Sequence, residues 1–216
     1  LLGAAKRRHK GKYNSKYKEI IKLAEFCNLP IVTSAGHGDA IPFNHKLHAG
    51  QMGPRGNPVA SRLVKEANVI LAIGTRLGFN STFYSYENIN KKAKIVHIEL
   101  EKKMLGKYFP IKIGIHADAA TATKQIYEQI KKNKIEIDVK NWTNLYLKER
   151  NKYLIDRDNN NLGKNFPIQP KGLFKKLRKA LPKNSAITLD AGTLCLQATD
   201  ALESVSYTHL RAHETN

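Results

Sequence analysis

The feature that most constrains the fold is an uninterrupted apolar run, Val-Ile-Leu-Ala-Ile, at residues 69–73, which ends at Gly74. A membrane-spanning helix needs about 20 apolar residues, so this run is far too short to cross a bilayer. Short continuous runs of this kind are typical of parallel strands that helices cover on both faces. The run therefore predicts a buried parallel sheet with a layer of helices on each side.

Apolar residues elsewhere alternate between strand-length runs and helical spacing. The predicted strands lie at residues 31–33, 69–73, 95–98 and 111–115, and the predicted helices cover residues 15–27 and start at residues 58 and 119. Asn57 and Pro58 are the residue types expected at an N-cap and at the first position of a helix. Alternating strands and helices predict an α/β fold with a Rossmann-like parallel sheet flanked by helices.

Changes in composition along the chain indicate more than one domain. The predicted divisions are residues 1–133 for the first α/β domain, 134–165 for a charged connector with a helix at about 142–154, 166–204 for a truncated second α/β domain, and 205–216 for a non-native tail. A helix after Pro170 and a strand at residues 186–189 open the second domain. The tail is similar to translated sequencing-adapter read-through. We therefore expect the natural sequence to stop near Glu203, and we assign no function to His209 or His213.

The formal net charge of +19 raises the question of nucleic-acid binding. The lysines are spread along the chain, however, aromatic residues are not interleaved with them, and no nucleic-acid-binding motif is present. We expect a solvated, lysine-rich surface, with neither a nucleic acid nor a membrane as partner. Cys27 and Cys195 lie far apart and give neither a disulfide framework nor a metal-binding spacing, which favours the cytoplasm.

Two glycine-containing segments have the character of ligand-binding loops. Gly50, Gly53 and Gly56 run into the helix predicted from residue 58, whose unpaired N–H groups suit a phosphate. A plain glycine-rich turn explains this spacing equally well. Residues 74–76, Gly-Thr-Arg, leave the buried strand at its carboxyl end, where α/β sheets bind ligands. The arginine suits a phosphate or an adenine ring, or it pairs with a neighbouring carboxylate.

Acidic residues follow the next two predicted strands. Glu99 and Glu101 come directly after the strand at residues 95–98, the usual place for an acid that binds ribose hydroxyls. Asp118 follows the fourth strand and is predicted to cap the next helix, a role that can coexist with ligand binding.

The histidines and cysteines do not predict a catalytic centre. His45 and His48, with His37 and Asp39 nearby, have no third metal ligand at a convincing spacing, and the prolines and glycines around them predict a loop. Neither cysteine has a histidine partner at a telling distance, and no Ser-His-Asp arrangement is apparent. We assign no catalytic and no metal-binding residue.

Taken in order, these motifs resemble the central domain of thiamine-diphosphate enzymes of the acetolactate-synthase type. The matching segments are residues 23–25, 29–33, 36–42, 45–50, 53, 67–77, 93–99 and 117–119, and the resemblance covers roughly residues 15–131. Residues 189–193, Leu-Asp-Ala-Gly-Thr, resemble the opening of the family's C-terminal domain, which binds the diphosphate. Acetolactate synthase, sulfoacetaldehyde acetyltransferase and oxalyl-CoA decarboxylase share this plan, and the sequence does not choose among them.

The resemblance implies two cofactor sites. A nucleotide site in the central domain holds FAD in some members, an ADP or CoA moiety in others, and nothing in many. By position, this site would be lined by Gly53, Gly74, Thr75, Arg76, Glu99 and Asp118. Thiamine diphosphate would lie beside Gly192, Thr193 and Leu194. Glu99 and Glu101 stand where acetolactate synthases usually have aspartates, and the longer side chains fit a ribose less well, which disfavours FAD.

The resemblance also implies that this chain is a fragment that is inactive alone. The family's N-terminal domain supplies a glutamate that helps to generate the thiamine ylid. Its C-terminal domain supplies a Gly-Asp-Gly motif and an asparagine that hold Mg²⁺ on the diphosphate. Neither lies in these residues. The parent is expected to decarboxylate 2-keto acids, or to form or cleave their C–C bonds, as a cytoplasmic homodimer or homotetramer. The alternatives are a stand-alone FAD- or ADP-binding module without thiamine chemistry and a basic nucleic-acid-binding protein.

Overall fold

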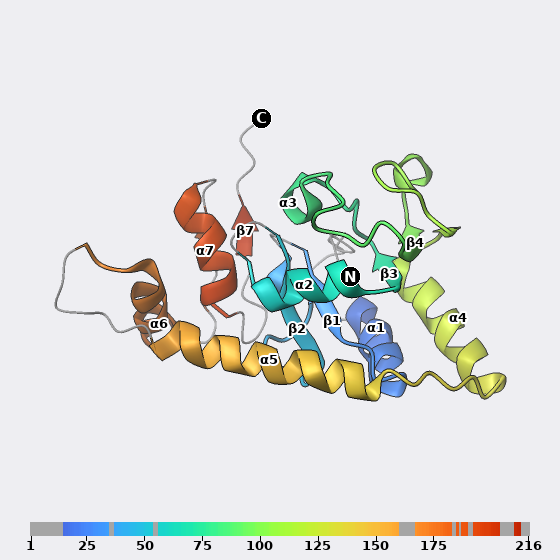
Figure 1. Cartoon of the computed structure of the whole chain (residues 1–216), viewed down its shortest axis with the longest axis horizontal. Helices are drawn as coiled ribbons and strands as arrows, with labels where there is room; N and C mark the ends of the chain where they lie inside the picture. Colours follow the sequence, from blue (N-terminus) through green and yellow to red (C-terminus); the bar gives the residue numbers. More distant parts are fainter. Residues whose placement is uncertain are drawn as a thin grey trace.

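The computed structural model describes residues 15–34, 37–53, 56–159, 167–182, 185, 187–189, 192–203 and 210–212. Within them, helices and strands alternate along the chain, with η marking a 3-10 turn (Figure 1). In chain order the elements are α1 (Ser15–Phe26), β1 (Ile31–Thr33), η1 (Gly38–Ala40), β2 (His48–Gln51), α2 (Pro58–Glu66), β3 (Val69–Ile73), α3 (Phe79–Thr82), β4 (Lys94–Glu99), η2 (Lys102–Met104), β5 (Ile113–His116), α4 (Ala119–Lys132), α5 (Lys140–Asn159), α6 (Pro170–Ala180), β6 (Ile187–Leu189), α7 (Thr193–Ala201) and β7 (Leu210–Ala212). Every described strand pair is parallel, which confirms the predicted α/β class.

The apolar run at residues 69–73 forms β3, the strand that it predicts. It pairs along its whole length with residues 94–98 of β4, and β4 pairs in turn with β5. Ile70 and Ala72 belong to a core cluster that includes α2, whereas Ile73 belongs to a second cluster that includes α1 and α4. Helices therefore cover both faces of this strand, as its continuous apolar sequence predicts.

The start of α2 confirms the predicted cap. The side-chain oxygen of Asn57 accepts a hydrogen bond from the N–H of Val59 (2.8 Å), and Pro58 takes the first helical position. Proline fits there because that N–H has no partner within the helix.

Three elements differ most from the sequence-based prediction, which also contained no helix at residues 79–82 (α3). The predicted loop around His45 and His48 contains β2, whose sequence His-Ala-Gly-Gln has none of the β-branched residues that reveal a strand. The fourth strand, predicted at residues 111–115, is β5 (Ile113–His116), because Ile111 instead packs against the core from the preceding turn. The helix predicted at about 142–154 is the longer α5, whose charged ends carry no apolar periodicity.

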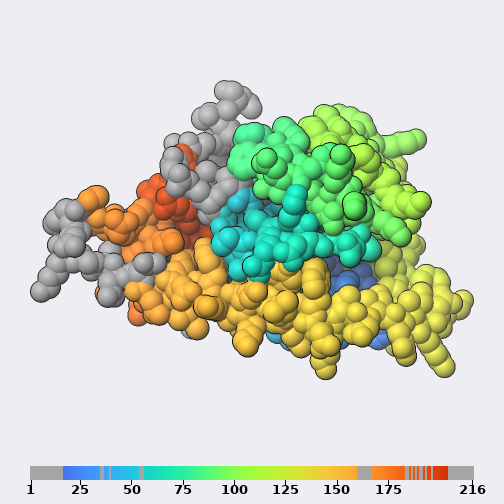
Figure 2. All heavy atoms as spheres, in the orientation of Figure 1, coloured from blue at the N-terminus to red at the C-terminus, as the bar shows by residue number. Residues whose placement is uncertain are grey.

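Helix α5 lies along one side of the molecule and joins its two parts (Figure 1). It packs against α2 and β2 and also against α6. In Figure 2 it forms a continuous strip, yellow to orange, along the lower border. β6 pairs with β7, which falls within the tail predicted to be non-native, although most of that tail lies outside the described residues. The predicted domain divisions remain predictions.

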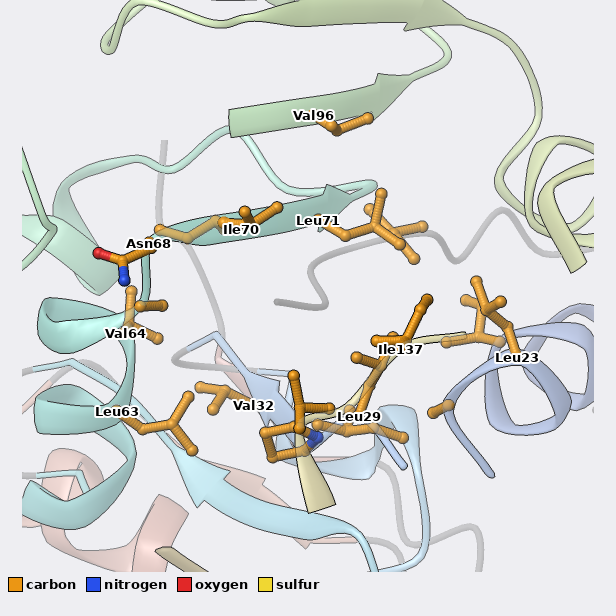
Figure 3. A pocket seen from close by; sticks show the side chains of 18 of the residues that line it. Leu23, Leu29, Val32, Leu63, Val64, Asn68, Ile70, Leu71, Val96 and Ile137 are labelled. Atoms are coloured by element: carbon orange, nitrogen blue, oxygen red, sulfur yellow. The ribbon is translucent and has the colours of Figure 1, made fainter. Parts of the chain in front are cut away.

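A large apolar cavity lies between the β1–β2 pair and β3 (Figure 3). Its volume is about 790 Å³. The space is partly open to solvent, and its walls are mostly apolar side chains.

Candidate functional site

The carboxyl ends of β3, β4 and β5 meet along one edge, where parallel α/β sheets bind their ligands. The N–H of Gly74 donates to the carbonyl of Ile98 (2.9 Å), and the N–H of Ala117 donates to the carbonyl of Glu99 (3.2 Å). Gly74 has a φ of +57°, in the left-handed region that favours glycine. The residues gathered at this edge are Gly74, Thr75, Arg76, Glu99 and Asp118, all those predicted for a nucleotide site except Gly53.

Both carboxylates at this edge accept hydrogen bonds from the backbone. Glu99 Oε1 accepts from the N–H groups of the two residues that follow it (2.8 and 3.2 Å). Asp118 Oδ1 accepts from the N–H groups two and three positions further on (3.1 and 3.2 Å) and so caps α4. The predicted capping role of Asp118 is confirmed. Among the described residues, nothing donates to the second oxygen of Glu99, which leaves it available to a hydroxyl.

Arg76 is an exposed cation at this edge. The alternative considered for it, an ion pair with a neighbouring carboxylate, is not found within the described part of the chain. Its charge instead acts on Tyr108. A hydrogen bond with Tyr84, together with the positive charges of Lys107 and Arg76, holds the pKa of Tyr108 below its usual range. Arg76 is therefore near enough to Tyr108 to act on it through its charge, and no ion pair of Arg76 with an acid is found among the described residues.

A cluster of aromatic rings accompanies Arg76, and sequence reasoning missed it. The rings of Tyr84 and Tyr108 lie 4.5 Å apart, and Phe79 contacts both Phe83 (4.9 Å) and Tyr84 (5.9 Å). Phe79, Phe83 and Tyr84 are 52%, 42% and 50% exposed, unusual for neighbouring large apolar side chains. The Phe-Asn-Ser-Thr-Phe-Tyr-Ser-Tyr segment was the available signal. Exposed rings beside a cation suit a ligand with a planar ring and a negative charge.

The buried side chain of His97 stabilises this edge through two hydrogen bonds. It is buried in β4, its Nε2 donates to the carbonyl of Thr75 (2.8 Å), and its Nδ1 accepts from the N–H of Gly106 (3.3 Å). A carbonyl only accepts and an N–H only donates, so these partners require the neutral ring with its proton on Nε2. Burial lowers the pKa of His97 and so favours this form. The apolar sequence of β4 contains no signal that predicts this role for His97.

Gly53, the remaining nucleotide-site prediction, lies after β2 and not at the β3–β5 edge. Its N–H donates to the hydroxyl of Ser61 at 3.4 Å. A Cβ added to Gly56 would stand 2.5 Å from the backbone oxygen of Gln51, so close packing alone requires glycine there. The loop therefore fits the reading as a glycine-rich turn, although Pro54 and Arg55 lie outside the described residues.

The residues predicted to lie beside thiamine diphosphate are at the start of α7. Gly192 is its N-cap, without a side-chain cap, and Leu194 is 51% exposed, whereas the side chain of Thr193 is not described. The same helix contacts the central part of the chain, since Gln51 Nε2 donates to the hydroxyl of Thr199 (2.8 Å). At a rise of about 1.5 Å per residue, the start of α7 lies about 9 Å along the helix from this contact.

Comparison with known proteins decides the family. The model of the thiamine pyrophosphate enzyme central domain matches residues 9–126, more than half of the chain. The chain belongs to the thiamine pyrophosphate enzyme family. This confirms the resemblance seen in the motifs.

Relatives within the thiamine pyrophosphate enzymes carry two kinds of name. A sulfoacetaldehyde acetyltransferase of Castellaniella defragrans is 27% identical over 200 residues, which cover 82% of this chain and 33% of that protein. A probable acetolactate synthase large subunit of Methanococcus aeolicus is 27% identical over 190 residues, 81% of this chain and 31% of that protein. The chain thus spans about a third of the length of these relatives.

The histidine-rich segment of this thiamine pyrophosphate enzyme domain has internal partners. His45 Nε2 faces Glu25 (3.4 Å), and His48 Nδ1 donates to the carbonyl of Phe43 (3.3 Å). Across the described ranges, no three histidine, cysteine, aspartate or glutamate side chains are grouped to hold a metal ion. Nor is any helix in those ranges long and apolar enough to span a bilayer.

Proposed function

We propose that the protein is a thiamine-diphosphate-dependent enzyme and that this chain supplies its central domain. The enzyme would decarboxylate 2-keto acids, form or cleave their C–C bonds, or transfer an acetyl group. The observation that carries this proposal is the family match over residues 9–126. The names of the relatives, acetolactate synthase and sulfoacetaldehyde acetyltransferase, both contain an acetyl unit, which supports a two-carbon unit as part of the substrate or product. The enzyme would act in the cytoplasm as a homodimer or homotetramer.

The start of α7 is a suitable place for the diphosphate of the cofactor. A Cβ added to Gly192 would meet nothing within 4 Å, so the backbone there is open to a ligand. The N–H groups of the first helical turn, at Thr193 and Leu194, carry the partial positive charge that favours phosphate. When bound, thiamine diphosphate stabilises the carbanion that forms on the substrate. Mg²⁺ would need ligands beyond those that the described residues bring together.

The enzyme proposal is tested by reading the gene outward on both sides of this coding segment and assaying the encoded protein. We expect it to consume pyruvate or sulfoacetaldehyde only when thiamine diphosphate and Mg²⁺ are added. The 216-residue chain alone is the matched control and is expected to show no turnover. Activity that does not depend on thiamine diphosphate in the longer protein would contradict the proposal.

A second proposal concerns the β3–β5 edge, which we infer binds the ADP part of a nucleotide. The exposed Arg76 would contact a phosphate, the rings of Phe79 and Tyr84 would stack on the adenine, and Glu99 would accept from a ribose hydroxyl. The longer glutamate in place of an aspartate favours ADP or a CoA moiety over FAD.

Calorimetric titration of the chain with ADP tests this edge. We expect Arg76→Ala to weaken ADP binding about tenfold or more, because a charge-assisted hydrogen bond contributes roughly 1.5–3 kcal/mol. Arg62→Ala, which removes an exposed arginine from α2, is the control and should bind ADP as the wild type does. Equal affinities for all three proteins, or no heat of binding at all, would refute the nucleotide proposal without affecting the thiamine proposal.

A further inference from the structure

The β1–β2 pair and the sheet of β3, β4 and β5 lie on opposite sides of the apolar cavity (Figure 3). Among the described residues, β1 pairs with β2 alone and β3 pairs with β4 alone, so each of the two strands has one edge without a described neighbour. Residues of both strands line the cavity. Its walls therefore contain backbone N–H and C=O groups as well as apolar side chains.

Hydrogen bonds at β1 show which of its backbone groups turn toward the cavity. The N–H of Ile31 donates to the carbonyl of Leu47 (2.7 Å), and the carbonyl of Thr33 accepts from the N–H of Met52 (2.9 Å). The backbone groups of successive residues in a strand point to opposite edges. The N–H and C=O of Val32 therefore turn away from β2 and toward the cavity.

The same alternation applies to β3. The carbonyl of Asn68 accepts from the N–H of Lys94 (2.8 Å), and the N–H of Gly74 donates to the carbonyl of Ile98 (2.9 Å). The backbone groups of the even-numbered residues of β3 thus face β4. Those of the odd-numbered residues, Ile73 among them, turn toward the cavity. Two rows of backbone groups therefore border it, one on each side.

An extended segment of chain can pair with both rows at once. A central strand of a parallel sheet donates and accepts hydrogen bonds along both of its edges, whereas a buried backbone group without a partner is costly. The side chains of such a strand alternate between the two faces of the sheet, where the cluster of α2 and the cluster of α1 and α4 lie. We therefore expect the occupant to be an uncharged, apolar strand.

The chain has a segment of this kind shortly before α1. Residues 1–5 read Leu-Leu-Gly-Ala-Ala, with no charged residue and no proline, whereas residues 6–14 are rich in lysine and arginine. Because each strand residue extends the chain by about 3.3 Å, five residues match the length of β3, which also has five. Composition and length both fit an inner strand of the sheet.

The connection through α1 places this segment beside β1. Helix α1 ends at Phe26, β1 begins at Ile31, and the two elements share a core cluster. A strand joined through such a helix to a second strand of the same sheet runs parallel to it, with a right-handed crossover, and the two are usually neighbours. One edge of β1 is already paired with β2. The remaining edge is the one that borders the cavity.

We propose that residues 1–5 form a parallel strand that docks between β1 and β3 and joins the two groups of strands into one sheet. The order of this sheet is β2, β1, residues 1–5, β3, β4 and β5. The docked strand pairs with Val32 on one side and with the odd-numbered residues of β3 on the other, and its side chains fill the cavity. The proposal does not rest on the proposed enzyme function, and the family match begins only at residue 9.

Hydrogen exchange of single amides, followed by NMR in the whole 216-residue chain, tests the docked strand. We expect the N–H groups of Val32 and Ile73 to exchange as slowly as those of Ile31 and Gly74, which donate toward β2 and β4. Each strand thus contains its own reference amide, one residue away from the amide that reports on the cavity edge.

Ala4→Pro should break the docked strand, because proline cannot donate to a ladder and is not tolerated in a central strand. We expect the amides of Val32 and Ile73 to exchange about tenfold faster or more in this variant, since they lose their partners. Lys10→Pro, in the basic segment that follows, is the matched control and should exchange as the unchanged chain does.

Three results would overturn the proposal. Fast exchange of Val32 and Ile73 in the unchanged chain is the first, and it does not depend on whether any variant folds. Equal exchange in Ala4→Pro and Lys10→Pro is the second, because residue 4 would then not belong to the strand. Protection that falls when the chain is diluted is the third, because a second copy would then supply the strand.

Discussion

Replacing Arg157 by methionine is expected to lower the free energy of unfolding of the α5–α7 contact by about 3–5 kcal/mol, the usual cost of removing one partner of a buried ion pair. The Arg157 side chain is 2% exposed and that of Asp200 is 5% exposed. Its Nη1 donates to the carbonyl of Asp200 (2.8 Å) and faces the carboxylate (3.4 Å), its Nε donates to Asp158 (2.9 Å), and its Nη2 contacts Glu203. The substitution would leave the buried carboxylate of Asp200 without its cation, whereas Asp158 and Glu203 would keep their ion pairs with Arg178.

The acid at the centre of this network makes the Arg157 prediction dependent on pH. Burial raises the pKa of Asp200, and Arg157 opposes that effect. Without the arginine, Asp200 should take up a proton more readily, so Arg157→Met should cost less at pH 4 than at pH 7. Tyr153 donates to Asp200 (2.8 Å) and would then face a neutral acid.

Urea unfolding at both pH values, with hydrogen exchange of α7, measures the effect of Arg157→Met. Arg62→Met is the control, because Arg62 pairs with Glu66 and Glu149 at the surface and should cost under about 1 kcal/mol. If Arg157→Met and Arg62→Met lower the free energy of unfolding by the same amount, the Arg157 network does not hold α7 in place.

Acid should destabilise the protein through His48, which is 1% exposed. Burial, aided by the positive charge of Arg150, lowers the pKa of His48 to about 3 against the hydrogen bond that its ring donates to Phe43. Between pH 6.5 and about 3, His48 is therefore protonated in the unfolded chain but neutral in the folded chain. The free energy of unfolding should fall in this window by up to ~1.4 kcal/mol for each pH unit, and the loss stops above pH 6.5.

Urea unfolding of the wild type and His48→Gln at pH 7, 6, 5 and 4 tests this expectation. Glutamine does not titrate, so the difference between the two proteins should shrink as the pH falls. His97 is also buried, and burial lowers its pKa. It therefore adds a fall in the free energy of unfolding with acid that both proteins share. His116→Gln, at an exposed position, should follow the wild type. Parallel curves for the wild type and His48→Gln would show that folding does not lower the pKa of His48.

Those parts of the fold that depend on local sequence could be predicted. The continuous apolar run specifies β3, and Asn57 with Pro58 specifies the start of α2, because each signal acts within a few residues of itself. β2 could not be found because its small and polar residues become strand only through pairing with β1. Its place is therefore set by the assembled sheet and not by its own sequence.

In the candidate site, too, the features that depend on local sequence could be predicted and the long-range contacts could not. Gly74, Glu99 and Asp118 were placed by their position after strands, a rule that holds for parallel sheets in general. The role of His97 depends on a carbonyl 22 residues away, and the contact of Tyr84 with Tyr108 depends on two loops meeting at the same edge. A single sequence contains no pattern that shows which distant residues come into contact. The cavity could not be predicted for a related reason, since it depends on how far the β1–β2 pair lies from the three-stranded sheet of β3, β4 and β5.

The packing of α5 has a consequence for how this protein can be cut into working parts. Tyr146, in the first half of α5, is 1% exposed and belongs to the same core cluster as Leu63 and Ile95. A chain that stopped at residue 133, the predicted end of the first domain, would lose this ring from its own interior. The smallest segment that keeps the central core whole therefore extends through the first half of α5. A cut at the loop before α5 is therefore expected to destabilise the central core, whereas a cut beyond Tyr146 is expected to preserve it.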